Sequence, residues 1–185
     1  DEKYIADFPH MCRAVGIPFQ KIDIKDARQM EPALSRDLVA VYGVNDASIN
    51  PFKLSIENLN DAVSKGSQYF SYCRLEGFEI NNGKITLAKV RNVIKNEFLF
   101  IKADTYINAS GAWAKNVADL AGITINMVFS KGSLVVTNQR VTKRVINRLR
   151  KSTDGDILVP GGVVSILGTT SLRIDAPDNI FPTIG

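Results

Sequence analysis

TYINASGAWAKNVADLAG, residues 105–122, decides how the chain is organised. Apolar residues alternate in its first part, which predicts a strand, and Ser110 and Gly111 predict a tight corner. A helix is expected from about Ala112 until Gly122 ends it. Corners of small residues between a strand and a helix often bind phosphate, because the helix N-terminus presents free backbone N–H groups. The alternative is a plain connection with no ligand.

The usual phosphate-binding fingerprints do not accompany this corner. The 185 residues contain neither Gly-x-Gly-x-x-Gly nor Gly-x-x-x-x-Gly-Lys-Ser/Thr. In the later stretch SILGTTSLRID, Gly162 and Gly168 are one residue too far apart for the second pattern, and no lysine follows. Thr169 and Thr170 are therefore predicted either to donate hydroxyls to an anion or to be β-branched residues at a strand end.

Composition places the chain among ordinary soluble globular proteins. It is 45% hydrophobic and 23% charged, with a net charge of +4, which permits an anionic ligand but does not require nucleic acid. Cys12 and Cys73 lie far apart and in no motif, which argues against a disulfide scaffold or a zinc site. No apolar run has the length of a membrane span.

Metal and hydrolase sites are poorly supported. His10 is the only histidine, so neither a histidine-rich metal site nor a Ser–His–Asp triad can be identified. Asp154, Asp156 and Asp175 lack the spacing of a metal-binding loop and are expected to be solvated carboxylates. We therefore expect no metal.

The periodicity predicts an α+β fold, a mainly antiparallel sheet with flanking helices. Asn82-Gly83 lies between two alternating runs and predicts a hairpin. Asn50 and Pro51 predict a helix start, and the apolar stripe that follows is Phe52, Ile56, Leu59 and Val63. The expected helices are 4–15, a short one after Asp23 that ends before Pro32, 51–65 and 112–121, and the expected strands are 38–44, 69–75, 78–90, 98–109, 127–136, 156–160 and 163–171.

Three further features give site hypotheses. Lys131 lies in a Lys-Gly-Ser bend and is expected to be exposed, with Gly132 allowing close backbone approach. The basic stretch 140–151 is predicted to be either a solvated helix face or an anion-binding face, and its lack of aromatic residues argues against base stacking. The expected buried face of the helix after the corner is Trp113, Val117, Leu120 and Ala121.

These motifs, in this order, resemble a known family of flavoproteins. INASGAWAKNVADLAGI is similar to the Asn-Ala-x-Gly-x-Trp stretch of D-amino-acid-oxidase-like proteins. KGSLVV, INRLRKSTDGDILVP and SILGTTSLRID resemble one branch, the FAD-dependent glycerol-3-phosphate dehydrogenases, above all the large subunit of the anaerobic bacterial enzymes. Glu31-Pro32 and the stretch from Asn50 to Leu54 match the same pattern, although Asn50 and Lys53 replace an aspartate and an arginine.

The resemblance runs along essentially the whole chain and implies an internal piece of a longer protein, since the family's Gly-x-Gly-x-x-Gly lies at its N-terminus. It implies FAD in the full-length protein but not in this piece, which is expected to be inactive alone. It also divides the chain into a helical cap-side segment, 1–66, FAD-domain strands with the corner, 67–125, and substrate-domain strands, 126–185. The implied cofactor contacts are Leu75, Ala109, Ser110, Gly111 and Trp113, and the implied substrate contacts are Lys131, Gly168, Thr169 and Thr170.

The implied chemistry is oxidation of sn-glycerol 3-phosphate to dihydroxyacetone phosphate by hydride transfer to FAD, with electrons passing to a quinone through partner subunits. The implied location is cytoplasmic, peripheral on the inner face of the membrane. Aerobic relatives carry a histidine after the Gly-Ser of the bend, whereas this chain has Leu134, and no catalytic base is identified. The rival hypotheses are a stand-alone anion-binding module and a purely structural interaction domain.

Overall fold

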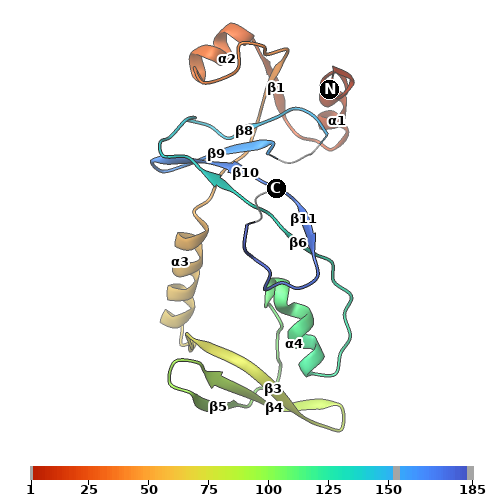
Figure 1. Ribbon diagram of the computed structural model, residues 1–185, viewed down its shortest axis with the longest axis vertical. Helices are drawn as coiled ribbons and strands as arrows, with labels where there is room; N and C mark the ends of the chain where they lie inside the picture. Colours follow the sequence, from red (N-terminus) through yellow and green to blue (C-terminus); the bar gives the residue numbers. More distant parts are fainter. Residues whose placement is uncertain (1, 152–154, 183–185) are drawn as a thin grey trace. The chain divides into compact units, whose positions relative to one another are not determined.

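The computed structural model describes residues 2–151 and 155–182 (Figure 1). It confirms the predicted α+β class, because four small sheets are combined with a few helices. The helices are α1 Glu2–Ala14, α2 Ile24–Met30, α3 Pro51–Ser64, the 3₁₀-helix η1 Gly111–Trp113 and α4 Ala114–Leu120. The strands are β1 Phe19–Ile22, β2 Val41–Val44, β3 Cys73–Asn81, β4 Lys84–Asn92, β5 Glu97–Ile101, β6 Phe129–Lys131, β7 Val135–Val136, β8 Ile146–Asn147, β9 Ile157–Gly161, β10 Val164–Gly168 and β11 Leu172–Ile174.

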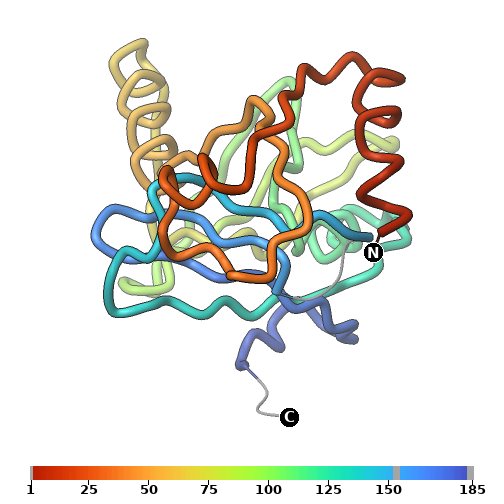
Figure 2. Tube along the Cα trace, turned by 90° about the horizontal axis from the view of Figure 1, so that it is seen from above, coloured from red at the N-terminus to blue at the C-terminus, as the bar shows by residue number. Residues whose placement is uncertain are grey.

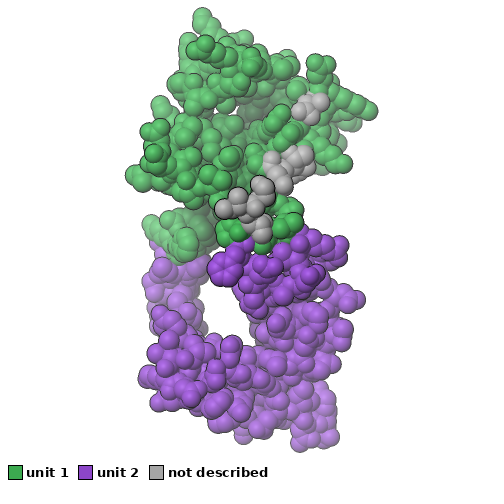
Figure 3. All heavy atoms as spheres, viewed as in Figure 1, with its two compact units in different colours: residues 1–54, 131–172, 182–185 green, residues 55–130, 173–181 purple. Residues whose placement is uncertain are grey.

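The chain divides into two compact units, each built from separate stretches of sequence (Figure 3). Unit 1 contains residues 1–54, 131–172 and 182–185, and unit 2 contains residues 55–130 and 173–181. Three of the four boundaries fall inside α3, β6 and β11, and the fourth follows Phe181. β6 and β11 pair with each other.

In the N-terminal part of unit 1, an aromatic cluster joins a helix to a small sheet. β1 and β2 pair antiparallel, with Phe19 opposite Val44. The ring centroid of Phe8 on α1 lies 5.2 Å from that of Tyr42 and 6.5 Å from that of Phe19. Cys12, one turn further along α1, is buried. Aromatic residues on both elements therefore supply this local core.

The remainder of unit 1 is a four-stranded antiparallel sheet in the order β7-β10-β9-β8. Figure 2 shows the β9–β10 hairpin in blue beside the teal-to-cyan stretch that precedes it in the sequence, and β7 in that stretch pairs with β10. Gly162 forms the hairpin turn with a φ of +66°, a left-handed conformation that favours glycine. The predicted strands at 156–160 and 163–171 are thus confirmed in the main.

Unit 2 is built on the three-stranded antiparallel sheet β3-β4-β5. Asn82 and Gly83 close the first hairpin with φ values of +49° and +73°, as the dipeptide predicts. Ala88 of β4 is buried, and Phe78 packs edge-on against Tyr106 at a centroid distance of 5.8 Å. α4 packs against β3, and Ala118 is the buried residue of this helix.

The strand expected at 98–109 forms only in its first part, as β5, and does not reach the corner. Residues 102–110 have no regular secondary structure. A strand is stabilised by hydrogen bonds to a neighbour, and no described strand pairs with this segment. Alternating apolar residues alone were therefore insufficient to predict it.

The helix α3 forms as predicted, but its apolar stripe is not buried. Asn50 accepts the backbone N–H of Lys53 at 3.0 Å, the expected cap. Phe52 is nevertheless 79% exposed, and of the α3 residues, all described, none is buried. Helical periodicity predicts which residues share a face, whereas burial requires a second element to cover it.

The basic stretch 140–151 is not a helix. It contains bends and the short strand β8, because acceptors elsewhere in the chain bind its backbone N–H groups. The hydroxyl of the fully buried Ser165 accepts the N–H of Val141 at 2.9 Å, and the carboxylate of Glu31 accepts the N–H of Lys143 at 3.0 Å. The prediction of a solvated helix face was therefore wrong.

Candidate functional site

Two distant stretches of unit 1 meet at the predicted substrate side. The backbone N–H of Ser133 donates to the hydroxyl of Thr170 at 2.9 Å, and the N–H of Thr170 donates to the carbonyl of Ser133 at 3.3 Å. The Lys131–Ser133 bend and the Gly168–Thr170 turn are thereby joined. The structure thus places the bend that carries Lys131 beside the turn of Gly168, Thr169 and Thr170, although more than thirty positions separate the two in the sequence.

A glycine is required at position 132, where the two stretches touch, whereas at Gly168 the nearest atom belongs to the exposed side chain of Leu134. A Cβ at Gly132 would collide with the Thr169 hydroxyl and would lie 2.9 Å from the carbonyl oxygen of Thr170. A Cβ at Gly168 would lie 2.5 Å from the side chain of Leu134. The expectation that Gly132 permits close backbone approach is confirmed, and the approaching backbone belongs to the same unit.

The hydroxyl groups of Thr169 and Thr170 differ in whether their protons are already used in hydrogen bonds within the junction. Thr169 Oγ1 lies 3.0 Å from the carbonyl oxygen of Thr170 and donates to it. Thr170 Oγ1 accepts from Ser133, so its own proton is directed elsewhere. Lys131 is half-buried, and the expectation that it is exposed was wrong.

The corner between Asn108 and Ala114 is organised by one amide side chain. Asn108 Oδ1 accepts the hydroxyl of Ser110 at 2.6 Å, and Asn108 Nδ2 donates to the carbonyl of Ala114 at 2.9 Å. Gly111 has a φ of +58°, and its Cβ position would have nothing within 4 Å. Ala109 is exposed. The corner therefore presents accessible backbone over small residues.

The predicted buried face after the corner is only partly correct. Trp113 is 44% exposed, and its indole Nε1–H donates to Asp178 Oδ1 at 2.9 Å. Leu120 is also exposed, Val117 is half-buried, and Ala118 is the buried residue. The 3₁₀ turn before α4 changes which residues of the helix face β3, since it has fewer residues per turn.

Leu75 lies on β3 next to an ion-pair cluster that sequence reasoning missed. The Glu76 carboxylate is 2.9 Å from Arg74 Nη2 and 3.2 Å from Arg91 Nε. The hydrogen bond from Arg74, aided by the charges of Arg74, Arg91 and Lys89, holds the pKa of Glu76 below its ordinary value of 4.5. A β-bulge between Leu75 and Gly77 places Glu76 outside the regular ladder.

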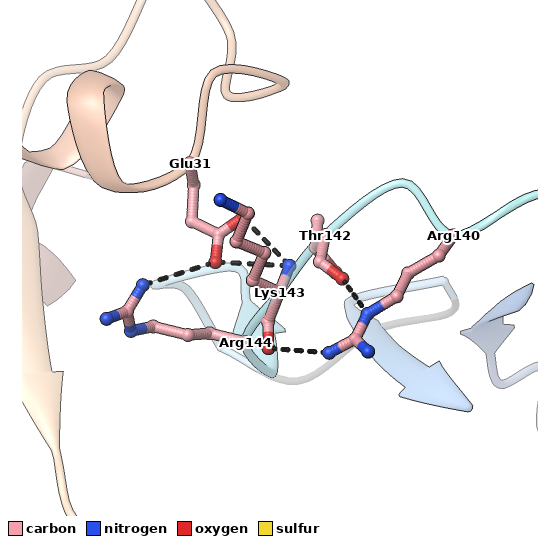
Figure 4. Close-up of polar contacts among 5 residues, drawn as sticks. All are labelled: Glu31, Arg140, Thr142, Lys143 and Arg144. Atoms are coloured by element: carbon pink, nitrogen blue, oxygen red, sulfur yellow. Dashed lines mark hydrogen bonds and ion pairs between the residues drawn. The ribbon is translucent and has the colours of Figure 1, made fainter. Parts of the chain in front are cut away.

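A second missed cluster surrounds Glu31 (Figure 4). Its side chain is 4% exposed, and its two oxygens lie 3.0 and 3.2 Å from the backbone nitrogen of Lys143. Arg144 Nη1 lies 3.5 Å away, and Arg140 donates to the carbonyls of Thr142 and Lys143. The carboxylate thus fixes the basic segment. Only the Glu-Pro motif indicated that this position was special.

Asp156 forms a third missed contact. The expectation that it is solvated was wrong, because its side chain is 10% exposed and its Oδ1 lies 2.5 Å from Arg150 Nη2. Asp175 is exposed as expected, and Asp154 lies outside the described residues. Among the described histidines, cysteines and acidic residues, no group of three could hold a metal ion. No helix in the described part of the chain is long and apolar enough to span a bilayer.

Comparison with known proteins gives a family match over nearly the whole chain. Residues 1–184 match the family described as FAD dependent oxidoreductase (DAO). The A subunit of the anaerobic glycerol-3-phosphate dehydrogenase of Escherichia coli is 37% identical over 175 residues. That alignment covers 95% of this chain and 32% of the relative, so the chain spans about a third of its relative's length.

Solved structures share the fold at lower sequence identity. The L-proline dehydrogenase of P. horikoshii superposes with a TM-score of 0.79 at 22% identity, over 99% of this chain and 50% of that one. The glycerol-3-phosphate dehydrogenase of Bacillus halodurans, complexed with FAD, gives a TM-score of 0.73 at 21% identity, over 86% and 34%. At these identities the likeness establishes the fold alone.

Proposed function

This chain belongs to the FAD dependent oxidoreductase family, and we propose that it is part of a dehydrogenase that oxidises glycerol 3-phosphate. The observation that carries the proposal is the 37% identity to the A subunit of a glycerol-3-phosphate dehydrogenase along 95% of the chain. The product is dihydroxyacetone phosphate. On this proposal, residues 126–185 belong to the substrate domain, 67–125 to the FAD domain and 1–66 to the cap side.

The junction of the bend and the turn in unit 1 is the proposed substrate side. Lys131 supplies a cation, and the Thr170 hydroxyl has a proton directed away from its partner Ser133. Gly168 and Thr169 complete the turn that fixes Thr170. A polyol phosphate needs such hydroxyl and cationic partners. This support is geometric, since hydrogen bonds within the junction hold these residues in fixed positions.

The corner in unit 2 fits a supporting contact with FAD. Open space over Gly111 and the exposed Ala109 allow a flat ligand to approach the backbone, while Ser110 is held by Asn108. Leu75 and the half-exposed Trp113 would add apolar surface. When bound, FAD supplies the two-electron acceptor for alcohol oxidation. The residues of this chain supply position and charge.

We further propose partner subunits that pass electrons to a quinone, with the assembly peripheral on the inner face of the membrane. The support is that the relative's name designates one subunit of an enzyme. A stand-alone anion-binding module is the alternative function, favoured only by the cations of residues 140–151. The flavin content of the full-length protein separates the two.

The test is anaerobic titration of the purified full-length protein with glycerol 3-phosphate, followed by flavin absorbance. The expected result is bound FAD whose absorbance bleaches with glycerol 3-phosphate and persists with glycerol. Bleaching by L-proline but not by glycerol 3-phosphate would contradict the substrate. A full-length protein that contains no flavin would favour the anion-binding alternative.

A further inference from the structure

We propose that Arg150, held in place by Asp156, binds the phosphate group of the substrate at the end of the four-stranded sheet where Thr169 and Thr170 lie. The identity of the molecule that carries this phosphate, glycerol 3-phosphate, rests on the proposed function. The phosphate site itself follows from the sheet register and from one partly buried ion pair, Arg150 with Asp156.

The register brings the relevant residues to one end of the sheet. Ile157 lies opposite Gly168 on one side and opposite Asn147 on the other. Arg148, Asp156 and Thr169 are the residues next to these three in the chain, and each lies just beyond its strand at the same end of the sheet. The backbone N–H of Arg148 donates to the carbonyl of Asp156 at 2.8 Å, so the pairing of β8 with β9 extends one residue further.

Hydrogen bonds connect this end of the sheet to the proposed substrate side. The backbone N–H of Gly155 donates to the carbonyl of Thr169 at 3.2 Å. On the other side, Thr170 donates to the carbonyl of Ser133 at 3.3 Å. The segment that carries Asp156 and the bend that carries Lys131 therefore flank the same turn from opposite sides.

Arg150 is held with its guanidinium in a defined orientation. Its Nε donates to Asp156 Oδ1 at 2.8 Å, and its Nη2 lies 2.5 Å from the same oxygen. The side chain remains 22% exposed, against 10% for Asp156. Within the described residues, no contact engages Nη1. One edge of the guanidinium is therefore used for positioning, and further N–H donors remain for a ligand.

A phosphate is the ligand that this arrangement suits. A guanidinium forms paired charge-assisted hydrogen bonds to phosphate oxygens, and a fixed guanidinium loses less entropy on binding than a mobile one. An ion pair that is only partly removed from water usually contributes little net stability, so stability alone is a weak reason for this one. Lys131 and the Thr170 hydroxyl supply the further donors that a phosphate dianion requires.

The experiment compares variants of the full-length enzyme loaded with FAD. Arg150→Gln removes the charge, Arg150→Lys keeps it without the planar fork, and Asp156→Asn releases the positioning contact. A double variant, Arg150→Gln with Asp156→Asn, removes both charges and so leaves no unpaired carboxylate if the single variant fails to fold. Arg144→Gln is the matched control, because Arg144 lies before β8, at the opposite end of the same strand, and is 55% exposed.

The readouts are KM and kcat for glycerol 3-phosphate, flavin content, melting temperature and calorimetric binding of inorganic phosphate. Arg150→Gln is expected to raise KM by roughly tenfold to a hundredfold, with flavin content unchanged. Arg150→Lys should recover part of the loss, Asp156→Asn should raise KM by a smaller factor, and Arg144→Gln should remain within about twofold of wild type.

Three results would overturn the inference. The first is an unchanged KM in a folded Arg150→Gln variant or in the folded double variant. The second is a loss of flavin with unchanged KM, which would assign the guanidinium to a phosphate of the cofactor. The third is an Asp156→Asn variant that has a lower melting temperature but an unchanged KM. The proposed function can fail separately. If wild-type enzyme does not oxidise glycerol 3-phosphate, loss of inorganic phosphate binding in Arg150→Gln would still support the phosphate site.

Discussion

The carboxylate of Glu31 accepts the backbone N–H of Lys143 across 112 positions of sequence, at 3.0 and 3.2 Å for its two oxygens. A buried carboxylate that accepts a backbone N–H in this way fixes the path of the second segment rather than only neutralising a charge. The residue after α2 therefore determines the conformation of the basic stretch.

Removing this carboxylate should destabilise unit 1. Glu31→Ala is expected to lower the free energy of unfolding by about 1.5–3 kcal/mol, because the part-buried N–H of Lys143 loses a charged acceptor. Denaturant unfolding of the full-length protein, followed by a probe in unit 1, measures the change. Glu79→Ala, at an exposed position of β3, is the control and should have little effect. A change below about 0.5 kcal/mol for Glu31→Ala would contradict the anchoring role.

A methyl group at Gly132 should disrupt the proposed substrate side. Gly132→Ala places a Cβ against Thr169 and Thr170, so the bend and the turn must separate. We expect a loss of stability of about 1–3 kcal/mol and a parallel loss of kcat/KM for glycerol 3-phosphate. Gly77→Ala is the matched control, because its Cβ would have no atom within 4 Å. Equal effects of the two substitutions would show that this junction has no special role.

The hydroxyl of Thr170 should contribute both to structure and to catalysis. Thr170→Val removes the acceptor of the Ser133 N–H and is expected to cost about 1 kcal/mol of stability. On the proposed function it should also lower kcat/KM by roughly tenfold to a hundredfold. Thr86→Val on β4, which removes an exposed hydroxyl that donates to the Glu79 carbonyl on β3, controls for the hydroxyl loss. Steady-state kinetics of a folded Thr170→Val variant that match wild type would remove this residue from the site.

Trp113 should contribute less to stability than a fully buried tryptophan. Because the ring is 44% exposed, Trp113→Ala is expected to cost about 1–2 kcal/mol, below the range typical of buried aromatic residues. A double-mutant cycle between Trp113→Phe and Asp178→Ala isolates the indole hydrogen bond, with an expected coupling of about 0.5–1.5 kcal/mol. Zero coupling would mean that the contact at 2.9 Å contributes nothing to stability.

The Glu76 cluster predicts a pH dependence of stability. Its pKa is lowered in the folded protein, so the carboxylate stabilises the fold above its ordinary pKa of 4.5. This stabilisation is lost as the pH falls below 4.5 and through the depressed folded pKa. The melting temperature of wild type should therefore exceed that of Glu76→Gln at neutral pH, and the two should converge in acid.

The dependence of the melting temperatures on salt concentration provides a second test of the Glu76 cluster. Glu76 remains 29% exposed, so high ionic strength should reduce the difference in melting temperature between wild type and Glu76→Gln at neutral pH. A difference between the variants that is independent of both pH and salt would indicate a packing effect instead of an electrostatic one.

Local features were predictable because their causes lie within a few residues. Asn82-Gly83 determines its hairpin through its own φ preferences, and Asn50 caps α3 three residues away. Family membership was likewise visible, because its motifs are continuous stretches of sequence. These features required no knowledge of what lies elsewhere in the chain.

The features that were missed depend on partners that are distant in sequence. The basic stretch has many charges compatible with a helix, yet Ser165 and Glu31 bind the N–H groups that a helix would need. The burial of Asp156 depends on Arg150, and the orientation of Trp113 depends on Asp178. Periodicity describes one segment at a time and contains no information about such pairs.

The discontinuity of unit 1 has a consequence for its synthesis. Residues 1–54 emerge from the ribosome before residues 131–172, and the whole of 55–130 is made in between. The β1–β2 hairpin and its aromatic cluster can form early, whereas Glu31 must wait for the arrival of Lys143 to bury its charge. Such long-range contacts slow folding because a large loop must close first. The β3-β4-β5 sheet of unit 2 is therefore expected to form on the ribosome before unit 1 is completed, with the acidic side chain of residue 31 remaining solvated until Lys143 arrives.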